Sequence, residues 1–223
     1  MNQEQALSLL KETKLVAILR GIPVKQATDI ATALYDGGVR VLEFTFDHDD
    51  PDCVAHNCQR IRAVKKIFGD EMVVGCGTAL TVQEVEASVE AGGQIVISPN
   101  VDVSVIAKTK ALGAISMPGA LTPTEIVMAY NAGADIVKLF PAGTLGVPYI
   151  KAVRGPLGYI PMSAVGGVRP ETIADFLNVG VCGFGVGGEL VKKEFVRSGD
   201  MNALTSRAQK FVHAIEQWEA NRS

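Results

Sequence analysis

The feature that most constrains the fold is a regular alternation along the 223 residues. Short apolar runs, rich in β-branched residues, alternate with longer amphipathic stretches that mostly end at glycine. This alternation is typical of βαβ units and a parallel sheet. Eight strands in a chain of this length predict a short (β/α)8 TIM barrel that forms one domain over residues 1–223. The predicted strands are Leu15–Arg20, Val39–Phe46, Met72–Gly77, Gln94–Ser98, Ala114–Pro118, Asp135–Phe140, Ile160–Val165 and Val181–Val186.

The amphipathic stretches predict helices around the sheet, with an extra helix before the first strand. In the stretch Val24–Asp36, the spacing places four apolar residues on a single face, namely Ala27, Ile30, Ala31 and Leu34. An open doubly wound sheet is the alternative fold, but the first strand is not followed by its Gly-x-Gly-x-x-Gly turn. The predicted helices are Gln3–Glu12, Val24–Asp36, Thr81–Ala91, Val103–Leu112, Pro123–Ala132, Glu171–Val179 and Asn202–Glu219.

Composition limits the classes of partner. The formal net charge of −3 gives no basic surface for nucleic acid. No apolar run is long enough to span a bilayer, and the N-terminal residues lack the features of a signal peptide. The four cysteines match no zinc-binding spacing. We therefore expect a cytoplasmic protein that acts on a small molecule.

Lys138 is the most informative residue. It lies in an apolar strand, between Val137 and Leu139. Burial of an ammonium group is costly and favours the neutral amine, which is a nucleophile that can form a Schiff base with a ketone. A lysine that pairs with a carboxylate or extends to solvent is the alternative, and the position of Lys138 alone leaves both open.

Glu43 lies in the middle of the second predicted strand. Period-two alternation places Val41, Glu43 and Thr45 on one face of that strand. If this face is the barrel interior, the carboxylate and the Lys138 amine point into the same space. The amine would then supply the electron sink for carbon–carbon bond chemistry, and the carboxylate would move protons. A structural ion pair is the alternative.

Glycine pairs end the last two strands. Gly166-Gly167 follows the seventh strand and Gly187-Gly188 the eighth, where barrels of this kind commonly bind phosphate through backbone N–H groups. Tight turns would explain each pair equally well.

Two further strand ends carry polar residues. The segment Gly75-Cys-Gly-Thr78 ends the third strand. We expect its glycines to leave room for a small ligand and the Thr78 hydroxyl to bind a carboxylate. A simple turn is the alternative. Arg20 ends the first strand and can hold an anion, although a surface arginine is equally consistent with its position.

The segment Asp47-His-Asp-Asp-Pro-Asp52 is an acidic loop after the second strand. Its carboxylates could bind a divalent cation. A solvated turn that begins a helix is the interpretation that we favour, because runs of charge usually face solvent. We therefore predict no metal site.

With these residues in view, the chain resembles the 2-keto-3-deoxy-6-phosphogluconate (KDPG) / 4-hydroxy-2-oxoglutarate (KHG) aldolases, which are class I pyruvate aldolases with a (β/α)8 fold. The resemblance runs almost end to end, and its most specific part is the Lys-x-Phe-Pro strand with an upstream glutamate. The matching stretches are Val16-Ala-Ile-Leu-Arg-Gly21, Gly37-Gly-Val-Arg-Val-Leu-Glu43, Gly75-Cys-Gly-Thr78, Ile97-Ser-Pro99, Pro118-Gly119, Val137-Lys-Leu-Phe-Pro141 and Val165-Gly-Gly-Val168.

The resemblance implies a role for each candidate residue. Lys138 would form the imine with the pyruvate half of the substrate, and Glu43 would be the proton shuttle. Thr78 and Arg20 would hold the carboxylate, and the two glycine pairs, Gly166-Gly167 and Gly187-Gly188, would hold a distal phosphate. The pocket walls would include Pro99, Phe140 and Val165. The resemblance also implies a homotrimer and a reaction that needs no cofactor and no metal.

Three positions depart from the phosphogluconate-type pattern. Asp47 stands where those members have arginine, and we expect it to repel an acidic substrate. Phosphogluconate-type members frequently have threonine at the position of Val165, whereas valine is the residue of the galactonate-type branch. Gly188 stands where serine is frequent. The departures leave the aldehyde half of the substrate open.

Three functions remain to be compared. The leading one is a class I aldolase that reversibly cleaves a 2-keto-3-deoxy-4-hydroxy acid to pyruvate and an aldehyde. The second is a phosphate-binding barrel isomerase or decarboxylase, in which Lys138 acts electrostatically. The third is a non-catalytic sensor of keto acids.

Overall fold

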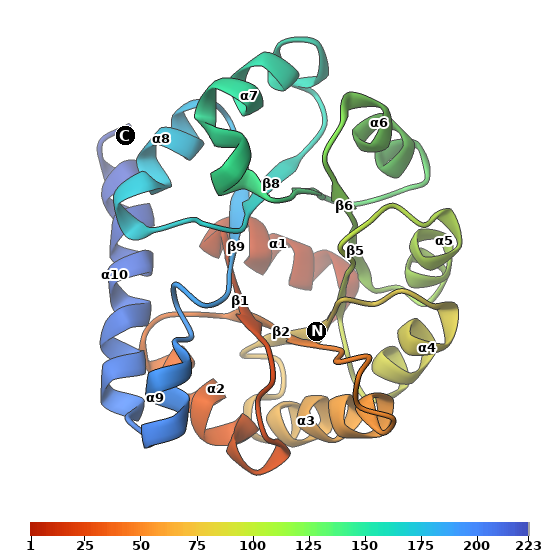
Figure 1. Cartoon of the computed structure of the whole chain (residues 1–223), viewed down its shortest axis with the longest axis vertical. Coiled ribbons are helices and arrows are strands. Elements are labelled where there is room, and N and C mark those ends of the chain that lie inside the picture. The colour runs from red at the N-terminus through yellow and green to blue at the C-terminus, as the bar shows by residue number, and fades with distance from the viewer. Residues whose placement is uncertain (223) are drawn as a thin grey trace.

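The computed structural model describes residues 1–222 and confirms the predicted fold class. Parallel strands form a barrel, and helices surround it (Figure 1). The strands are β1 (Leu15–Leu19), β2 (Val41–Thr45), β3 (Val73–Gly77), β4 (Ile95–Ile97), β5 (Ile115–Met117), β6 (Gly119–Ala120), β7 (Val137–Leu139), β8 (Met162–Val165) and β9 (Gly183–Val186). Their order in the sheet is β5-β4-β3-β2-β1-β9-β8-β7-β6.

The barrel closes through the fifth predicted strand. Pro118 splits that strand into β5, which pairs with β4, and β6, which pairs with β7. Proline has no N–H to donate to a neighbouring strand, which explains the break. Its carbonyl still accepts a hydrogen bond of 2.8 Å from the Lys138 N–H. The two ends of the strand order are therefore one continuous stretch of chain, and the eight predicted strands all form.

Alternation along the strands sorts side chains into two apolar clusters. Val41 belongs to the cluster inside the barrel, whereas Leu42 and Phe44 pack between the sheet and the outer helices. On β7, Val137 and Leu139 face the outer helices in the same way, and Ile136 faces inward. The parity of each strand thus directs Glu43 and Lys138 into the barrel.

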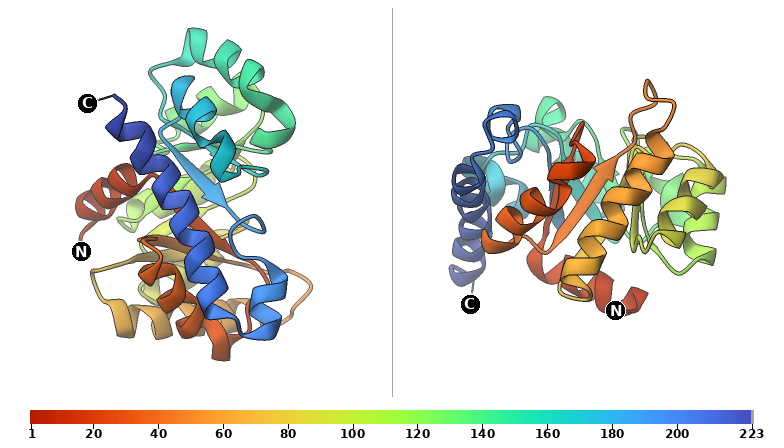
Figure 2. Two further views of the ribbon diagram at one scale, coloured as in Figure 1. Left: turned by 90° about the vertical axis from the view of Figure 1, so that its left-hand side faces the viewer. Right: turned by 90° about the horizontal axis from the view of Figure 1, so that it is seen from below.

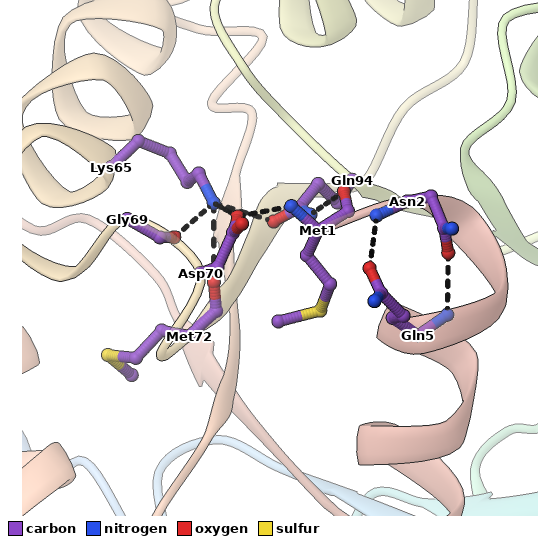
Figure 3. Close-up of polar contacts among 8 residues, drawn as sticks. All are labelled: Met1, Asn2, Gln5, Lys65, Gly69, Asp70, Met72 and Gln94. Carbon is purple, nitrogen blue, oxygen red and sulfur yellow. Dashed lines mark hydrogen bonds and ion pairs between the residues drawn. The ribbon is translucent and has the colours of Figure 1, made fainter.

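The helix α1 (Gln3–Thr13) closes one end of the barrel, as Figure 2 shows in its right-hand view. Ala6 and Leu10 of this helix are buried against the interior cluster. Asn2 caps the helix, because its side chain accepts a hydrogen bond of 2.9 Å from the Gln5 N–H while the Gln5 side chain accepts one from Asn2 (Figure 3).

Polar contacts hold the start of α1 against the strands. The Gln94 side chain donates a hydrogen bond of 3.1 Å to the Met1 carbonyl (Figure 3). The Lys65 ammonium donates one of 2.8 Å to the Gln94 side chain and also contacts the carbonyls of Gly69 and Met72. This end of the barrel is therefore sealed, and a ligand has to enter at the opposite end.

The bounds of the other helices agree with most of the predicted bounds, and three further helices are present. They are α2 (Ala27–Asp36), α3 (Cys53–Phe68), α4 (Val82–Glu90), α5 (Val103–Ala111), α6 (Pro123–Asn131), α7 (Ala142–Leu157), α8 (Ile173–Asn178), α9 (Lys193–Ser198) and α10 (Met201–Ala220), with short 3-10 turns η1 (Val24–Gln26) and η2 (Pro170–Thr172). The sequence patterns gave no bounds for α3, α7 or α9, although a helix was expected to begin after the acidic loop, where α3 begins. Within α7 the backbone leaves helical geometry at Gly146, and the helix contains Pro148 and Pro156, which obscure its pattern. Within residues 1–222, no helix has the length and apolar character needed to span a membrane.

Candidate active site

A cavity of about 520 Å³ opens at the carboxyl ends of the strands. All of the predicted site residues line it, namely Arg20, Glu43, Thr78, Pro99, Lys138, Phe140, Val165, Gly166, Gly167, Gly187 and Gly188. Five lining residues were not predicted: Ile18, Val168, Gly185, Val186 and Glu189. Ile18 could have been found, because its strand parity matches that of Val16 in the interior cluster. Glu189 lies in a loop, where periodicity carries no information.

Glu43 and Lys138 are the two ionisable groups buried in this cavity. Glu43 is 1% exposed and Lys138 is 7% exposed. The Lys138 ammonium lies 5.1 Å from the centre of the Phe140 ring, which walls the cavity. Oε2 of Glu43 is buried and accepts no hydrogen bond from any residue within 1–222. One carboxylate oxygen is therefore buried without a hydrogen-bond partner among the described residues.

Burial brings the pKa values of these two groups toward one another. Desolvation raises the pKa of Glu43 to about 7, against the opposing effect of the nearby Lys138 and Arg20 charges. Desolvation also lowers the pKa of Lys138, and the Arg20 charge lowers it further, whereas Glu43 raises it. The amine is thereby made easier to deprotonate, and the carboxyl group can both gain and lose a proton near neutral pH.

The glycines of β3 make room for protein atoms, and the prediction that they leave space for a ligand is wrong. A Cβ at Gly77 would lie 2.2 Å from Oε2 of Glu43, and one at Gly75 would lie 1.9 Å from the Ile95 carbonyl oxygen. Gly77 therefore allows the Glu43 carboxylate to occupy its position, and Gly75 allows β3 and β4 to approach closely.

Thr78 follows β3 with an unusual backbone conformation. Its φ is +58°, in the left-handed region that β-branched residues rarely adopt. Strain of this kind persists where the surroundings impose it, often at functional sites. This conformation places Thr78 on the cavity wall. No sequence pattern indicated it.

Glycine is needed for different physical reasons in the two glycine pairs. Gly166 and Gly167 have φ values of +90° and +72°, so their turn requires glycine. A Cβ at Gly188 would meet no atom within 4 Å, and one at Gly187 would make only ordinary contacts. At Gly187 and Gly188 the absence of side chains keeps the cavity open and the backbone accessible.

The acidic loop forms a turn before α3, which confirms the favoured interpretation. Asp50 pairs with His56 of α3 at 2.7 Å, between Oδ2 and Nδ1, and His48 pairs with Glu84 at 2.7 Å. Within residues 1–222, no cluster of three or more His, Cys, Asp or Glu side chains is suited to a metal ion. Asp47 does not line the Lys138 cavity but a neighbouring one, which Arg20 also lines.

Comparisons with known proteins agree with this geometry. Residues 7–207 match the family model described as "KDPG and KHG aldolase". A probable 2-dehydro-3-deoxy-6-phosphogalactonate aldolase of Rhizobium meliloti is 37% identical over 81% of this chain and 83% of its own. The KHG/KDPG aldolase of Escherichia coli K12 is 32% identical over 95% of this chain and 96% of its own.

Solved structures show the same fold. A structure described as native KDPGal superposes with a TM-score of 0.83 and 32% identity, over 92% of this chain and 96% of the other. The family model spans most of the chain, and the relatives match at over 30% identity along most of their length. The chain therefore belongs to the KDPG and KHG aldolase family.

Proposed function

We propose that Lys138 and Glu43 carry out the aldolase reaction of this family, the reversible cleavage of a 2-keto-3-deoxy acid to pyruvate and an aldehyde. The observation that carries the proposal is the burial of both side chains in one cavity at the open end of the barrel. An isomerase, a decarboxylase or a sensor is disfavoured, because the chain belongs to a family of aldolases.

Lys138 acts first, as the nucleophile. Its neutral amine attacks the C2 carbonyl of the keto acid and forms a carbinolamine, which loses water to give a protonated imine. The lowered pKa of Lys138 makes the neutral amine available for this step. The imine then accepts the electron pair of the C3–C4 bond as that bond breaks.

Glu43 moves the protons. Its carboxylate takes the proton of the C4 hydroxyl, directly or through a water molecule, as the aldehyde forms. The remaining enamine is reprotonated at C3 by the Glu43 carboxyl group, and hydrolysis of the imine releases pyruvate. A pKa of about 7 suits a group that acts in turn as base and acid.

The remaining lining residues bind the rest of the substrate. Thr78 and Arg20 bind the pyruvate carboxylate, and Pro99, Phe140 and Val165 wall the cavity. The loops at Gly166-Gly167 and Gly187-Gly188 border the aldehyde half and offer backbone N–H groups to it. Val165 and the higher identity of the 6-phosphogalactonate-type relatives favour a galactonate-type substrate.

The Schiff base is tested by trapping. Incubation with pyruvate and borohydride should attach a reduced pyruvyl group to Lys138, because reduction fixes the imine on the amine that formed it. Peptide mass spectrometry locates the adduct. The exposed Lys151 supplies the control: Lys151→Met should retain the adduct and Lys138→Met should lose it. An adduct elsewhere, or none while a known class I aldolase is trapped, contradicts the role of Lys138.

The pH dependence tests Glu43. Because Glu43 must be deprotonated to accept the C4 hydroxyl proton, kcat/KM for cleavage should rise with pH through about 7 and then level off. Glu43→Gln should lower kcat by about 100-fold to 10,000-fold. The variant should also shift the remaining acidic limb to lower pH, because Glu43 raises the pKa of Lys138.

The control for Glu43 is Glu216→Gln, a change at an exposed carboxylate of α10. It should leave the pH profile of kcat/KM in place. An acidic limb at the same pH in the wild type and in Glu43→Gln would rule out Glu43 as the titrating group.

Gly77 is a positioning residue for Glu43. Gly77→Ala should lower kcat by about 100-fold, because the new methyl group displaces the carboxylate. The acidic limb of the kcat/KM profile should move as well, since the carboxylate changes its surroundings. Gly155→Ala in α7 is the matched control, because a Cβ there meets no atom within 4 Å. Equal kcat values in both variants would contradict the positioning role.

We further propose that the protein is a cytoplasmic homotrimer. The family resemblance supports this assembly, and so do exposed apolar side chains on or just before the neighbouring helices α4, α5 and α6. These side chains are Leu80, Val103, Leu121, Met128 and Tyr130. Light scattering should give three times the chain mass of 23.6 kDa, and Val103→Glu with Leu121→Glu should reduce it. The mass of a single chain for the wild type would contradict the proposal.

A further inference from the structure

The chain contains the same capped turn at two places, each between a strand and a helix. The segment Leu80–Glu84 begins α4 and the segment Leu121–Glu125 begins α6, and both have the sequence Leu-Thr-x-x-Glu (Figure 1). We call them the α4 cap segment and the α6 cap segment. In both, the glutamate carboxylate accepts hydrogen bonds from the N–H groups of the leucine and the threonine, and the threonine hydroxyl accepts one from the glutamate N–H. The two segments therefore cap their helices in the same way.

Glu84 differs from Glu125 in its burial and in a contact with a second loop. Glu84 is 5% exposed, whereas Glu125 is half-buried. Oε2 of Glu84 accepts hydrogen bonds of 2.7 Å from the Leu80 N–H and 3.0 Å from the Thr81 N–H. Its Oε1 lies 2.7 Å from Nε2 of His48, which belongs to the loop between β2 and α3. One buried carboxylate therefore joins the loops that follow two neighbouring strands, β2 and β3.

The two cap segments also differ in what precedes them. The α6 cap segment follows β6 directly, whereas two residues, Thr78 and Ala79, separate β3 from the α4 cap segment. Thr78 lines the Lys138 cavity with a φ of +58°. Among the described residues that line this cavity, none belongs to the α6 cap segment. The cap of α4 therefore lies next to a residue of the candidate active site, and the cap of α6 does not.

The left-handed backbone of Thr78 depends on hydrogen bonds on both of its sides, because a β-branched residue does not favour this conformation. Before it, the Gly77 carbonyl accepts a hydrogen bond of 2.8 Å from the Phe46 N–H. After it, the Ala79 N–H donates one of 3.2 Å to a carbonyl of β4, and the next N–H group along the chain donates to Glu84. Removal of the Glu84 carboxylate would leave the Ala79 hydrogen bond alone to hold the backbone between Thr78 and α4.

We propose that Glu84 is a positioning residue for the binding of the keto-acid carboxylate. Its side chain fixes the turn that holds Thr78 in the left-handed conformation, and this conformation presents the Thr78 hydroxyl to the substrate. Because Glu84 does not line the Lys138 cavity, it acts through Thr78. The proposal rests on the aldolase function proposed above, in which Thr78 binds the pyruvate carboxylate.

The dependence of borohydride trapping on pyruvate concentration tests this role. Glu84→Ala should raise the half-saturating pyruvate concentration by about tenfold, because the Thr78 hydroxyl is no longer held in place. The maximal rate of trapping should change by less than about threefold, since the carboxylate is bound in the same way throughout the reaction. Glu84→Gln should restore the wild-type value, because the amide oxygen can accept the same two N–H hydrogen bonds.

Glu125→Ala is the matched control, because it removes the same cap from a segment that does not line the cavity. Leu80 and Leu121 are 39% and 41% exposed, so any effect of a lost cap on subunit assembly should be similar in both variants. Glu125→Ala should leave the half-saturating concentration unchanged. An equal rise in both variants, or a lower maximal rate in Glu84→Ala without a change in half-saturation, would overturn the proposal. If Glu84→Ala does not fold, Glu84→Asp and Glu125→Asp take the place of the two alanine variants, with the same expected difference.

A double-mutant cycle tests whether Glu84 acts through Thr78. Thr78→Ala removes the hydroxyl that Glu84 is proposed to position. In that background, Glu84→Ala should change the half-saturating pyruvate concentration by less than about twofold, because the two substitutions remove the same interaction. A further rise of the same size as in the wild-type background would place the effect of Glu84 elsewhere and overturn the proposal.

The wild type separates failure of the positioning role from failure of the aldolase function. If pyruvate is trapped on Lys138 of the wild type and Glu84→Ala has the wild-type half-saturating concentration, the positioning role is wrong and the aldolase function stands. If the wild type gives no adduct on Lys138 at any pyruvate concentration, both proposals are wrong.

Discussion

The site depends on the burial of one lysine and one glutamate in the same apolar barrel. In water the two groups would be fully charged near neutral pH, and their attraction would be weak. Burial penalises both charges, so that the pKa of Glu43 rises to about 7 while that of Lys138 falls. The protonation of the carboxyl group therefore changes easily near neutral pH, and the amine is easier to deprotonate than in water. The same penalty makes the pair costly to keep, and the barrel has to hold both side chains in place.

Several parts of the fold serve this constraint. Strand parity directs both side chains inward, and the interior cluster with α1 excludes water from the closed end. Gly77 provides the space that the Glu43 carboxylate occupies. The break at Pro118 lets the barrel close beside β7. The Pro118 carbonyl accepts a hydrogen bond from the backbone N–H of Lys138. The position of each reactive group is thus fixed by backbone and packing, and not by a flexible loop.

Much of this could be predicted from the sequence, because period-two alternation and parallel pairing are local patterns with global consequences. Those patterns gave the eight strands, the shared face of Val41, Glu43 and Thr45, and the strand ends that line the cavity, whereas the inward direction of Glu43 and Lys138 was left as a condition. They could not give the reason for Gly77, since the Glu43 atoms that it meets lie on another strand. They could not give the left-handed backbone of Thr78, a residue type that rarely adopts it. The helix α7 could not be predicted, because glycine and proline within it are not typical of a helix.

The division between strands and loops also separates chemistry from selectivity. Glu43 and Lys138, the proposed catalytic pair, lie on strands whose geometry the whole barrel determines, so their placement changes little unless the fold changes. The residues proposed to border the aldehyde half lie on loops after β8 and β9, which can vary without disturbing the core. The departures at Asp47, Val165 and Gly188 all fall at or after strand ends, as this division requires. A change in the preferred aldehyde is therefore expected to arise from such loop positions while the lysine and the glutamate stay the same.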